Sequence, residues 1–469
     1  MAAGRVSSAV LAVYLREQHL SYAELDRQVD HLARHLRDSG VRAGDVLALF
    51  SHSSWLTTLL LHACAKVGAT FYPVDPELPP QWQDDLLQQA GVEHVIRHDS
   101  INDTPEIDLT LLEITALGAK AEQGTLVDDI AVIIATSGSS GAPKGVMLSN
   151  RAVQASAAAV NAKLDLAAGD CWLNCLPLYH VGGLSIVYRT ALAGASMVLQ
   201  QGFDAVQVWQ DIKRYPVTHL SLVPVMLARL LDEADSTPPV RLKSVLVGGA
   251  ALNEKLASRA IEAGWPLCVT YGMSETASQV ATRCIGGNKD MAGMQGYVMP
   301  LIDGVECEVV DGESRITAQI GQVRIRGGCL MSGYANSGRI AGDGLDEAGW
   351  FTSGDLGRIN ERGFLRIVGR ADEMLISGGE NVNPHEVEML LLDCPGIDAV
   401  CVIGVTEPVW GQRVCAIYVG TFNEMEVEHW CRQEIKGALR PRQFVRLSHL
   451  PRLSTGKIDR MSIQREYAS

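Results

Sequence analysis

A segment rich in hydroxyl groups and glycines, followed by a lysine, is the first feature of the sequence that could do chemistry. It runs from Thr136 to Gly145 (TSGSSGAPKG) and directly follows the apolar run AVIIA. Glycines allow the backbone to turn its N–H groups toward one point, and hydroxyl groups add further donors. Lys144 adds a positive charge beside them. This composition predicts a loop that binds a polyphosphate, with an ordinary surface loop as the alternative.

Two other motifs of similar composition are excluded by their spacing. A Walker A loop has four residues between its first glycine and Gly-Lys-Ser/Thr, whereas Pro143 precedes Lys144 here. The nucleophile elbow of hydrolases requires Gly-x-Ser-x-Gly, and the segment from Gly138 to Gly141 is one residue short of it.

Six further segments, all later in the sequence, have residue types that suit a nucleotide site. Glycines at the end of an apolar run let a flat ring lie against bare backbone, and a tyrosine adds an aromatic face. The segments are VGGAA (247–251), YGMSET (271–276), WFTSGD (350–355), GRAD (369–372), SGGEN (377–381) and STGKIDR (454–460). Each segment is a weak signal alone, but six of them in this order are hard to assign to chance.

With these segments the chain resembles the adenylate-forming superfamily of acyl- and aryl-CoA synthetases. The resemblance covers nearly the whole chain, from YAELDRQVDHLARHL to LSTGKIDR. It implies a large N-terminal domain and a small mobile C-terminal domain that together enclose the site. It also implies a carboxylic acid, ATP, Mg²⁺ and coenzyme A as reactants and cofactors. Acid and ATP first give an acyl-adenylate and pyrophosphate, and the thiol of coenzyme A then displaces AMP.

The resemblance implies a role for each residue that matches a superfamily motif. The matching residues are Thr136, Ser137, Gly138, Ser139, Ser140 and Lys144 for the phosphates, Gly249, Ala250 and Tyr271 for adenine, Asp355 and Arg370 for ribose, Thr276 for the α-phosphate, Glu275 for Mg²⁺, Lys457 for the adenylation transition state, Asp372 for the hinge, and Gly378 and Gly379 for the pantetheine thiol. These roles agree with the chemistry, because attack of a carboxylate on a phosphate brings two anions together and needs cations where charge develops.

The acid pocket is predicted in the segment LPLYHVGGLS (176–185). His180 matches a histidine that gates the carboxylate, with a core histidine as the alternative, and Gly183 and Ser185 belong to the same segment. Arg189 is a charge within an otherwise apolar helical stretch. Because burying an unpaired charge is costly, Arg189 either reaches solvent or meets an anion. The second case implies a substrate with two carboxylates.

Within the superfamily, the segments HVGGLSIVYR and YGMSETASQVATR and the short chain are most similar to the o-succinylbenzoate–CoA ligases of menaquinone biosynthesis. That resemblance implies 2-succinylbenzoate as the acid. Ser274, Gln279 and Thr282 could add polar contacts, although a core role is equally compatible with the positions of Gln279 and Thr282. The alternatives are another aryl- or medium-chain acyl-CoA ligase, an acyl-AMP ligase that loads a carrier protein, or a non-catalytic relative.

The elements that must position these residues follow from the hydrophobic periodicity. Apolar residues at helical spacing predict a helix over Tyr22–Leu36, and short apolar runs predict buried strands with crossover helices between them. These strands are expected at Asp45–Phe50, Ala69–Val74, Ile130–Ala135, Thr218–Val223 and Ser244–Gly248. Alternating runs at Val305–Val310 and Gln322–Arg326 predict a β-rich subdomain, and Gly363–Gly369 a last strand. The fold class is therefore α/β, with domains at 1–369 and 370–469. The second is an α+β unit, which the resemblance implies to be mobile.

Bulk composition limits the location and partners. The formal net charge is −14, so the chain is a poor candidate for binding nucleic acid or an anionic membrane. The first 18 residues are expected to form a helix rather than a signal peptide, and no apolar run is long enough to span a membrane. The 11 cysteines include no CxxC pair, which favours small buried thiols in a reducing cytoplasm. The sequence leaves a homo-oligomer open.

Overall fold

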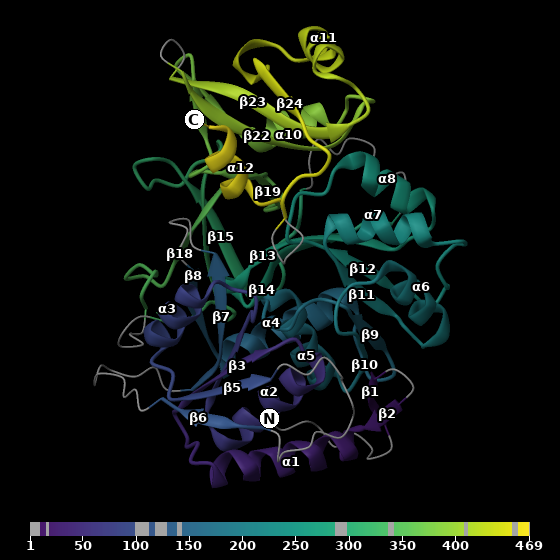
Figure 1. The fold of residues 1–469 in the computed structure, drawn as a ribbon, viewed down its shortest axis with the longest axis vertical. Coiled ribbons are helices and arrows are strands. Elements are labelled where there is room, and N and C mark those ends of the chain that lie inside the picture. Colours follow the sequence, from purple (N-terminus) through teal and green to yellow (C-terminus); the bar gives the residue numbers. More distant parts are fainter. Residues whose placement is uncertain are drawn as a thin grey trace.

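The structure is a computed structural model that describes residues 10–15, 18–98, 112–117, 129–137, 143–286, 298–335, 342–407, 411–452 and 458–468. A large part, built from the N-terminal four-fifths of the chain, lies below a smaller C-terminal part in Figure 1. The large part contains three sheets and the small part contains one. The predicted α/β class is confirmed by this arrangement.

The first sheet of the large part has eight strands, and its central strands are parallel. Its strand order is β14-β13-β12-β11-β9-β10-β1-β2, with β1 Leu11–Leu15, β2 Gln18–Ser21, β9 Cys171–Asn174, β10 Ser196–Leu199, β11 His219–Leu222, β12 Ser244–Val247, β13 Leu267–Met273 and β14 Ser278–Cys284. Its helices are α4 Asn150–Leu164, α5 Val181–Ala193, α6 Ala205–Arg214, α7 Pro224–Glu233 and α8 Glu254–Glu262. Strands β9 to β12 are entirely buried, as parallel strands covered on both faces require.

The second sheet has seven strands in the order β17-β8-β7-β4-β3-β5-β6. Its elements are β3 Val46–Ser51, β4 Thr70–Val74, β5 His94–His98, β6 Ile114–Ala116, β7 Ile130–Ser137, β8 Pro143–Ser149 and β17 Gly333–Ala335, with helices α1 Tyr22–Asp38, α2 Ser54–Val67 and α3 Pro80–Ala90. Helix α1 begins where predicted, because Ser21 and Glu24 form a capping box at its first turn. The strands predicted in this region are also present.

The prediction of a helix in the first 18 residues is wrong. Residues 11–15 form strand β1, which pairs in parallel with β10 and antiparallel with β2. The apolar run is too short to form a helix with a continuous buried face. As a strand it instead pairs with β10 on one side and with the edge strand β2 on the other, and it buries Val13 and Leu15.

The β-rich subdomain is present as a four-stranded antiparallel sheet in the order β15-β16-β18-β19. Its strands are β15 Val305–Val310, β16 Gly321–Gly327, β18 Phe351–Ile359 and β19 Leu365–Arg370, and the short helix η2 Ser274–Thr276 lies between β13 and β14. The β18–β19 hairpin places Asp355 opposite Arg370 in register.

The small C-terminal part has its own sheet, in which β21, β20, β23 and β22 are neighbours and β24 pairs with β23. Its elements are β20 Leu375–Ser377, β21 Glu380–Val382, β22 Ile397–Glu407, β23 Gly411–Gly420, β24 Gln443–Arg446, α10 Pro384–Leu391, α11 Glu424–Glu434, η3 Gly437–Leu439 and α12 Arg460–Tyr467. The fully buried residues of the large core end at Leu365, and from Leu375 onward they form separate clusters. The predicted boundary at Arg370 falls between these clusters and stays a prediction.

The cysteines were predicted to be buried free thiols, and one pair differs from this prediction. Cys268 and Cys284 are disulfide-bonded, because β13 and β14 place them directly opposite each other. Their separation of 16 residues gives no sequence signal of this pairing. The other nine cysteines are free, and all but Cys307 are buried as expected.

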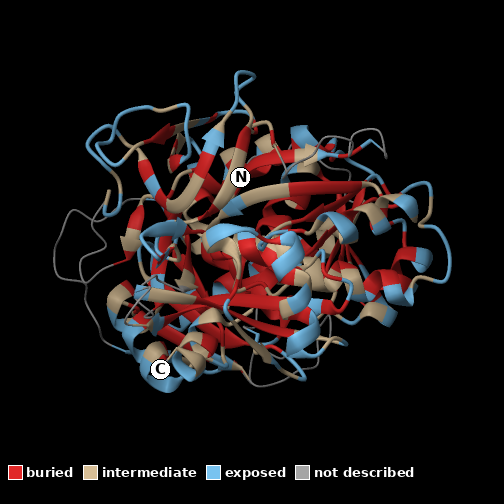
Figure 2. Ribbon diagram, turned by 90° about the horizontal axis from the view of Figure 1, so that it is seen from above, coloured by how far each residue is buried: buried red, intermediate tan, exposed pale blue. Residues whose placement is uncertain are grey.

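The buried residues lie mainly along the sheets. Figure 2 shows them running through the centre of the molecule, with exposed residues at its rim. Within the described ranges, no helix is long and apolar enough to cross a membrane.

Candidate functional site

The hairpin of β7 and β8 carries the described part of the predicted phosphate loop. Thr136 lies opposite Lys144, so both are strand residues at the end of the hairpin. Residues 138–142, with the predicted Gly138, Ser139 and Ser140, lie outside the described residues, and Ser137 is described only as part of β7. The Nζ atom of Lys144 is 5.3 Å from the ring centroid of Tyr334, a cation–π contact.

Tyr334 also joins this lysine to the predicted magnesium ligand. Its hydroxyl donates a hydrogen bond of 2.9 Å to Oε1 of Glu275. Tyr334 belongs to β17, which pairs with β8 and so stands beside the phosphate hairpin. Burial and the carboxylate of Glu275 both raise the pKa of the Tyr334 hydroxyl, which therefore remains a donor at neutral pH.

Thr276 is fully buried in η2, the turn between β13 and β14. Its hydroxyl lies 3.1 Å from the carbonyl of Met273 and 3.2 Å from that of Ser278. The next two residues have positive φ angles, 49° at Ala277 and 127° at Ser278, which are strained for residues with a side chain. Gly272 makes this turn sterically feasible, because a Cβ atom there would lie 1.7 Å from the carbonyl oxygen of Ser278.

Tyr271 meets the predicted ribose residues where β13 faces the β18–β19 hairpin. Gly249 and Ala250 are exposed at the end of β12, the neighbour of β13. The hydroxyl of Tyr271 donates a hydrogen bond of 2.6 Å to Asp355. Arg370 Nη1 lies 3.4 Å from the other oxygen of that carboxylate. Burial and the negative charge of Asp355 raise the pKa of Tyr271 well above its usual value.

Arg370 also forms an ion pair with the predicted hinge residue. Its Nε and Nη2 atoms each donate a hydrogen bond of 2.9 Å to the carboxylate of Asp372. This pair raises the pKa of the guanidinium, so Arg370 stays charged. Gly378 and Gly379, predicted to admit the thiol, form the two-residue turn between β20 and β21, where both have positive φ angles.

Arg189 is buried in α5 with only 1% of its surface exposed, which excludes the alternative that it reaches solvent. Its Nη2 atom donates a hydrogen bond of 2.8 Å to the hydroxyl of Ser278, and its guanidinium lies 5.3 Å from the ring centroid of Trp172. The Nε atom of this arginine has no hydrogen-bond partner among the described residues. Burial lowers the pKa of Arg189 to about 9, which still leaves it positively charged at neutral pH.

The remaining residues of the predicted acid pocket stand at the start of α5. His180 is the N-cap residue of α5, and its ring contacts the edge of the Tyr179 ring. The carbonyl of Gly183 accepts a hydrogen bond from Asn174, and Ser185 donates one to the carbonyl of Gly182. Thr282 donates to Gln279, and both are buried beside this region in β14.

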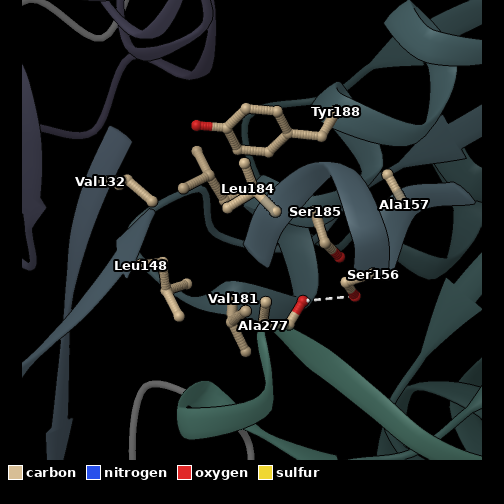
Figure 3. A pocket seen from close by; sticks show the side chains of 10 residues that line it. Val132, Leu148, Ser156, Ala157, Val181, Leu184, Ser185, Tyr188 and Ala277 are labelled. Atoms are coloured by element: carbon tan, nitrogen blue, oxygen red, sulfur yellow. Dashed lines mark hydrogen bonds between the residues drawn. The ribbon is translucent and has the colours of Figure 1, made fainter. Parts of the chain in front are cut away.

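A small cavity adjoins this region, as Figure 3 shows. Its walls include Ser185, Tyr188, Leu184 and Ala277, whose carbonyl accepts a hydrogen bond of 2.9 Å from Ser156. Its volume is about 10 Å³, enough for about one water molecule. It is therefore too small to hold a carboxylic acid of the predicted kind.

Lys457 lies outside the described residues, but the chain on both sides of it is described. Arg452 and Ile458 form an isolated antiparallel bridge, and the backbone N–H of Asp459 donates to the carbonyl of Pro451. The described residues on the two sides of 453–457 therefore lie next to each other on the small domain.

Sequence reasoning missed Tyr334 and Ser278, although each contacts a predicted site residue. Neither had a sequence signal, because Tyr334 is 59 residues from Glu275 and Ser278 is 89 residues from Arg189. Only the pairing of β17 with β8 and the turn after Thr276 bring these residues to the site.

Comparison with known proteins identifies related enzymes. Residues 2–335 match the AMP-binding enzyme family, and residues 386–457 match the AMP-binding enzyme C-terminal domain. A 2-succinylbenzoate–CoA ligase from Geobacillus sp. (strain WCH70) is 31% identical, over 97% of this chain and 94% of its own. One from Bacillus cereus (strain ATCC 14579) is 29% identical, over 97% and 95%.

Two solved structures of o-succinylbenzoate CoA synthetase from Bacillus subtilis have the same fold. The complex with the acyl-adenylate intermediate has a TM-score of 0.85 at 27% identity and covers 98% of this chain and 96% of that one. The complex with ATP and magnesium ion has a TM-score of 0.85 at 26% identity and covers 98% and 97%. The predicted superfamily is thereby confirmed, and the chain belongs to the AMP-binding enzyme family.

Proposed function

We propose that this chain is an ATP-dependent 2-succinylbenzoate–CoA ligase of the AMP-forming type. In the first half-reaction, a carboxylate oxygen of the acid attacks the α-phosphorus of ATP, and pyrophosphate leaves. In the second, the sulfur of coenzyme A attacks the acyl carbonyl carbon, AMP leaves, and the thiol proton is released. The relatives that match over nearly the full chain support this activity.

The ATP site is assigned to the residues that the geometry brings around β7, β13 and β18. Lys144 would neutralise the departing phosphates, Tyr271 would stack on adenine, and Asp355 would accept hydrogen bonds from the ribose hydroxyls. Arg370 holds that carboxylate in place from the other side. His180 is proposed to gate the acid.

Magnesium fits this site as an ion held mainly by ATP. Among the described residues no group of three or more histidine, cysteine, aspartate or glutamate side chains could hold a metal. Mg²⁺ in nucleotide sites needs only one or two carboxylates, with phosphates and water completing its shell. Glu275 provides one carboxylate, oriented by Tyr334. The ion would neutralise phosphate charge, and Lys457 is proposed to stabilise the negative charge of the adenylation transition state.

The observation that carries the choice of acid is the burial of Arg189. A buried guanidinium with one neutral hydroxyl partner and an aromatic neighbour is incompletely compensated. Ser278, its partner, is two residues from Thr276, so the cation stands close behind the residue proposed to face the α-phosphate. A second carboxylate on the acid would supply the missing anion, and 2-succinylbenzoate has one. A monocarboxylic acid would leave the charge uncompensated.

The proposal is tested by incubating the protein with ATP, Mg²⁺ and single acids: 2-succinylbenzoate, benzoate and octanoate. Pyrophosphate release and thioester formation are measured with and without coenzyme A. We expect both products from 2-succinylbenzoate and little from the monoacids. Thioester from octanoate alone would overturn the diacid assignment. Pyrophosphate release without any thioester would instead indicate an enzyme that loads a carrier protein. ATP and coenzyme A as substrates favour a cytoplasmic location.

A further inference from the structure

An ionic cluster in the small domain connects the hinge to the start of α12, three residues after Lys457. Its four members are Glu373, directly after the hinge residue Asp372, His385 and Glu388 of α10, and Arg460 at the start of α12. Their side chains are between 11% and 32% exposed, so they are largely withdrawn from water. None of them belongs to the ATP or acid site described above.

Arg460 and Glu388 form the centre of the cluster. Arg460 Nη2 donates a hydrogen bond of 2.7 Å to Oε1 of Glu388, and that oxygen also accepts one of 2.8 Å from the backbone N–H of Val402. Arg460 Nη1 in turn donates to the carbonyl of Val402. One guanidinium thus fixes α12 to both α10 and β22, with a fork geometry that a lysine cannot reproduce.

His385 and Glu373 extend the cluster to the hinge. His385 lies 2.9 Å from Glu388 through Nδ1 and 2.8 Å from Glu373 through Nε2, so its ring bridges the two carboxylates. Arg460 Nε lies 3.6 Å from the same oxygen of Glu373. The first residue after Asp372 is therefore tied to the same guanidinium as α10 and α12.

Arg460 lies three residues after Lys457 in the sequence, so its contacts bear on where that lysine is held. Ile458, which closes the bridge with Arg452, and Asp459, which caps α12, stand immediately before it. Lys457 is the next residue toward the N-terminus. A shift of Arg460 would therefore move Ile458 and Asp459, the described residues directly after Lys457, relative to the hinge.

We propose that Arg460 is a positioning residue for the adenylation half-reaction, which it serves by joining the start of α12, three residues after Lys457, to the residue that follows the hinge. Rotation at Asp372 then delivers the lysine to a defined place. This inference rests on the proposed function, in which Lys457 acts in adenylation. Thioester formation from a ready-made acyl-adenylate does not use that lysine and so does not depend on its placement.

The test measures the two half-reactions separately in an Arg460→Lys variant, which keeps the buried positive charge but loses the fork. We expect pyrophosphate release from 2-succinylbenzoate and ATP to fall roughly 10-fold or more, because small misplacements of a catalytic group are costly. Thioester formation from supplied acyl-adenylate and coenzyme A should stay within about twofold, with KM for ATP and acid unchanged. Arg432→Lys is the matched control, because Arg432 pairs with Glu428 on the exposed face of α11; we expect it to change neither rate.

An equal fall in both half-reactions, or no fall in either, would overturn the inference. If Arg460→Lys lowers Tm strongly, the same two half-reactions are measured in Glu373→Gln. This variant weakens the link to the hinge but leaves the pair of Arg460 and Glu388 intact. That variant should show the same one-sided loss to a smaller extent, and equal or absent losses would again contradict the proposal. A wild-type protein that releases no pyrophosphate with any acid would overturn the proposed function itself, and the role of Arg460 with it.

Discussion

The hydroxyl of Tyr271 donates a hydrogen bond of 2.6 Å to Asp355, which is 84 residues away in the sequence. The bond joins the ring proposed to stack on adenine to the carboxylate proposed to bind ribose. Tyr271→Phe keeps the ring but frees the carboxylate, so KM for ATP should rise roughly 5-fold, as the loss of one hydrogen bond of about 1 kcal/mol implies. Steady-state kinetics with ATP as the varied substrate check this.

Tyr22→Phe is the control for that substitution. The Tyr22 hydroxyl donates to the carbonyls of Ala195 and Thr190, far from the nucleotide residues. Its loss should lower Tm and leave KM for ATP unchanged. A similar change in KM for both variants would mean that Tyr271 affects only the stability of the fold.

Arg189→Ala should weaken binding of the diacid selectively. A hydrogen bond to a charged partner contributes about 1.5 to 3 kcal/mol, so KM for 2-succinylbenzoate should rise roughly 10- to 100-fold. Any residual activity with benzoate should change about twofold or less. The ratio of kcat/KM for the two acids is the measurement, and Tm shows whether the buried substitution harms folding. Equal losses on both acids would remove Arg189 from the acid pocket.

Lys457→Ala should affect the first half-reaction far more than the second. Removal of a group that stabilises transition-state charge costs on the order of 10²-fold in rate or more. Pyrophosphate release should fall by that factor, while thioester formation from supplied acyl-adenylate persists. Lys436→Ala, at an exposed lysine of the same domain, should leave both rates unchanged. Equal losses in the two half-reactions would exclude the proposed role.

Gly272→Ala should distort the turn that holds Thr276 and Ser278. The added Cβ would lie 1.7 Å from the Ser278 carbonyl oxygen, so the backbone must move at a cost of about 1–3 kcal/mol. Tm and adenylation activity should both fall. Gly312→Ala is the control, because a Cβ there meets no atom within 4 Å. Unchanged activity in Gly272→Ala would show that the turn tolerates the shift.

His385 should make the stability of the small domain depend on alkaline pH. Burial by itself lowers the pKa of His385, but the contacts with Glu373 and Glu388 outweigh it and raise the pKa from 6.5 to about 9. Because the folded state holds the proton more tightly, this stabilisation is fully present below about pH 6.5 and is lost as pH rises through about 9.

Thermal unfolding at several pH values checks that direction. The Tm of the wild-type protein should exceed that of His385→Gln at about pH 7, and the difference should shrink by about pH 10. A constant difference over that range would contradict a raised pKa at His385.

The predictable part of the fold was the part with a regular pattern. Helix α1 follows from its apolar spacing, and the buried parallel strands follow from short apolar runs. Strand β1 was not predictable in the same way, because five residues become a strand only when β10 and β2 offer backbone partners. The disulfide of Cys268 with Cys284 likewise depends on the register of β13 and β14.

The sequence by itself determined the chemistry of this protein. The order of glycine, hydroxyl, carboxylate and lysine segments resembles that of adenylate-forming enzymes, and attack of a carboxylate on a phosphate needs cations where charge develops. Only the tertiary structure decided whether the side chain of Arg189 is exposed or buried. The sequence had left two possibilities, exposure to solvent or contact with an anion. Burial depends on the elements that pack around α5, and it was the turn at Ser278 and the ring of Trp172 that enclosed the charge. The ion pair of Arg460 with Glu373 was also decided by the tertiary structure. The two residues are 87 positions apart, and an ion pair at such a separation leaves no local pattern in the sequence.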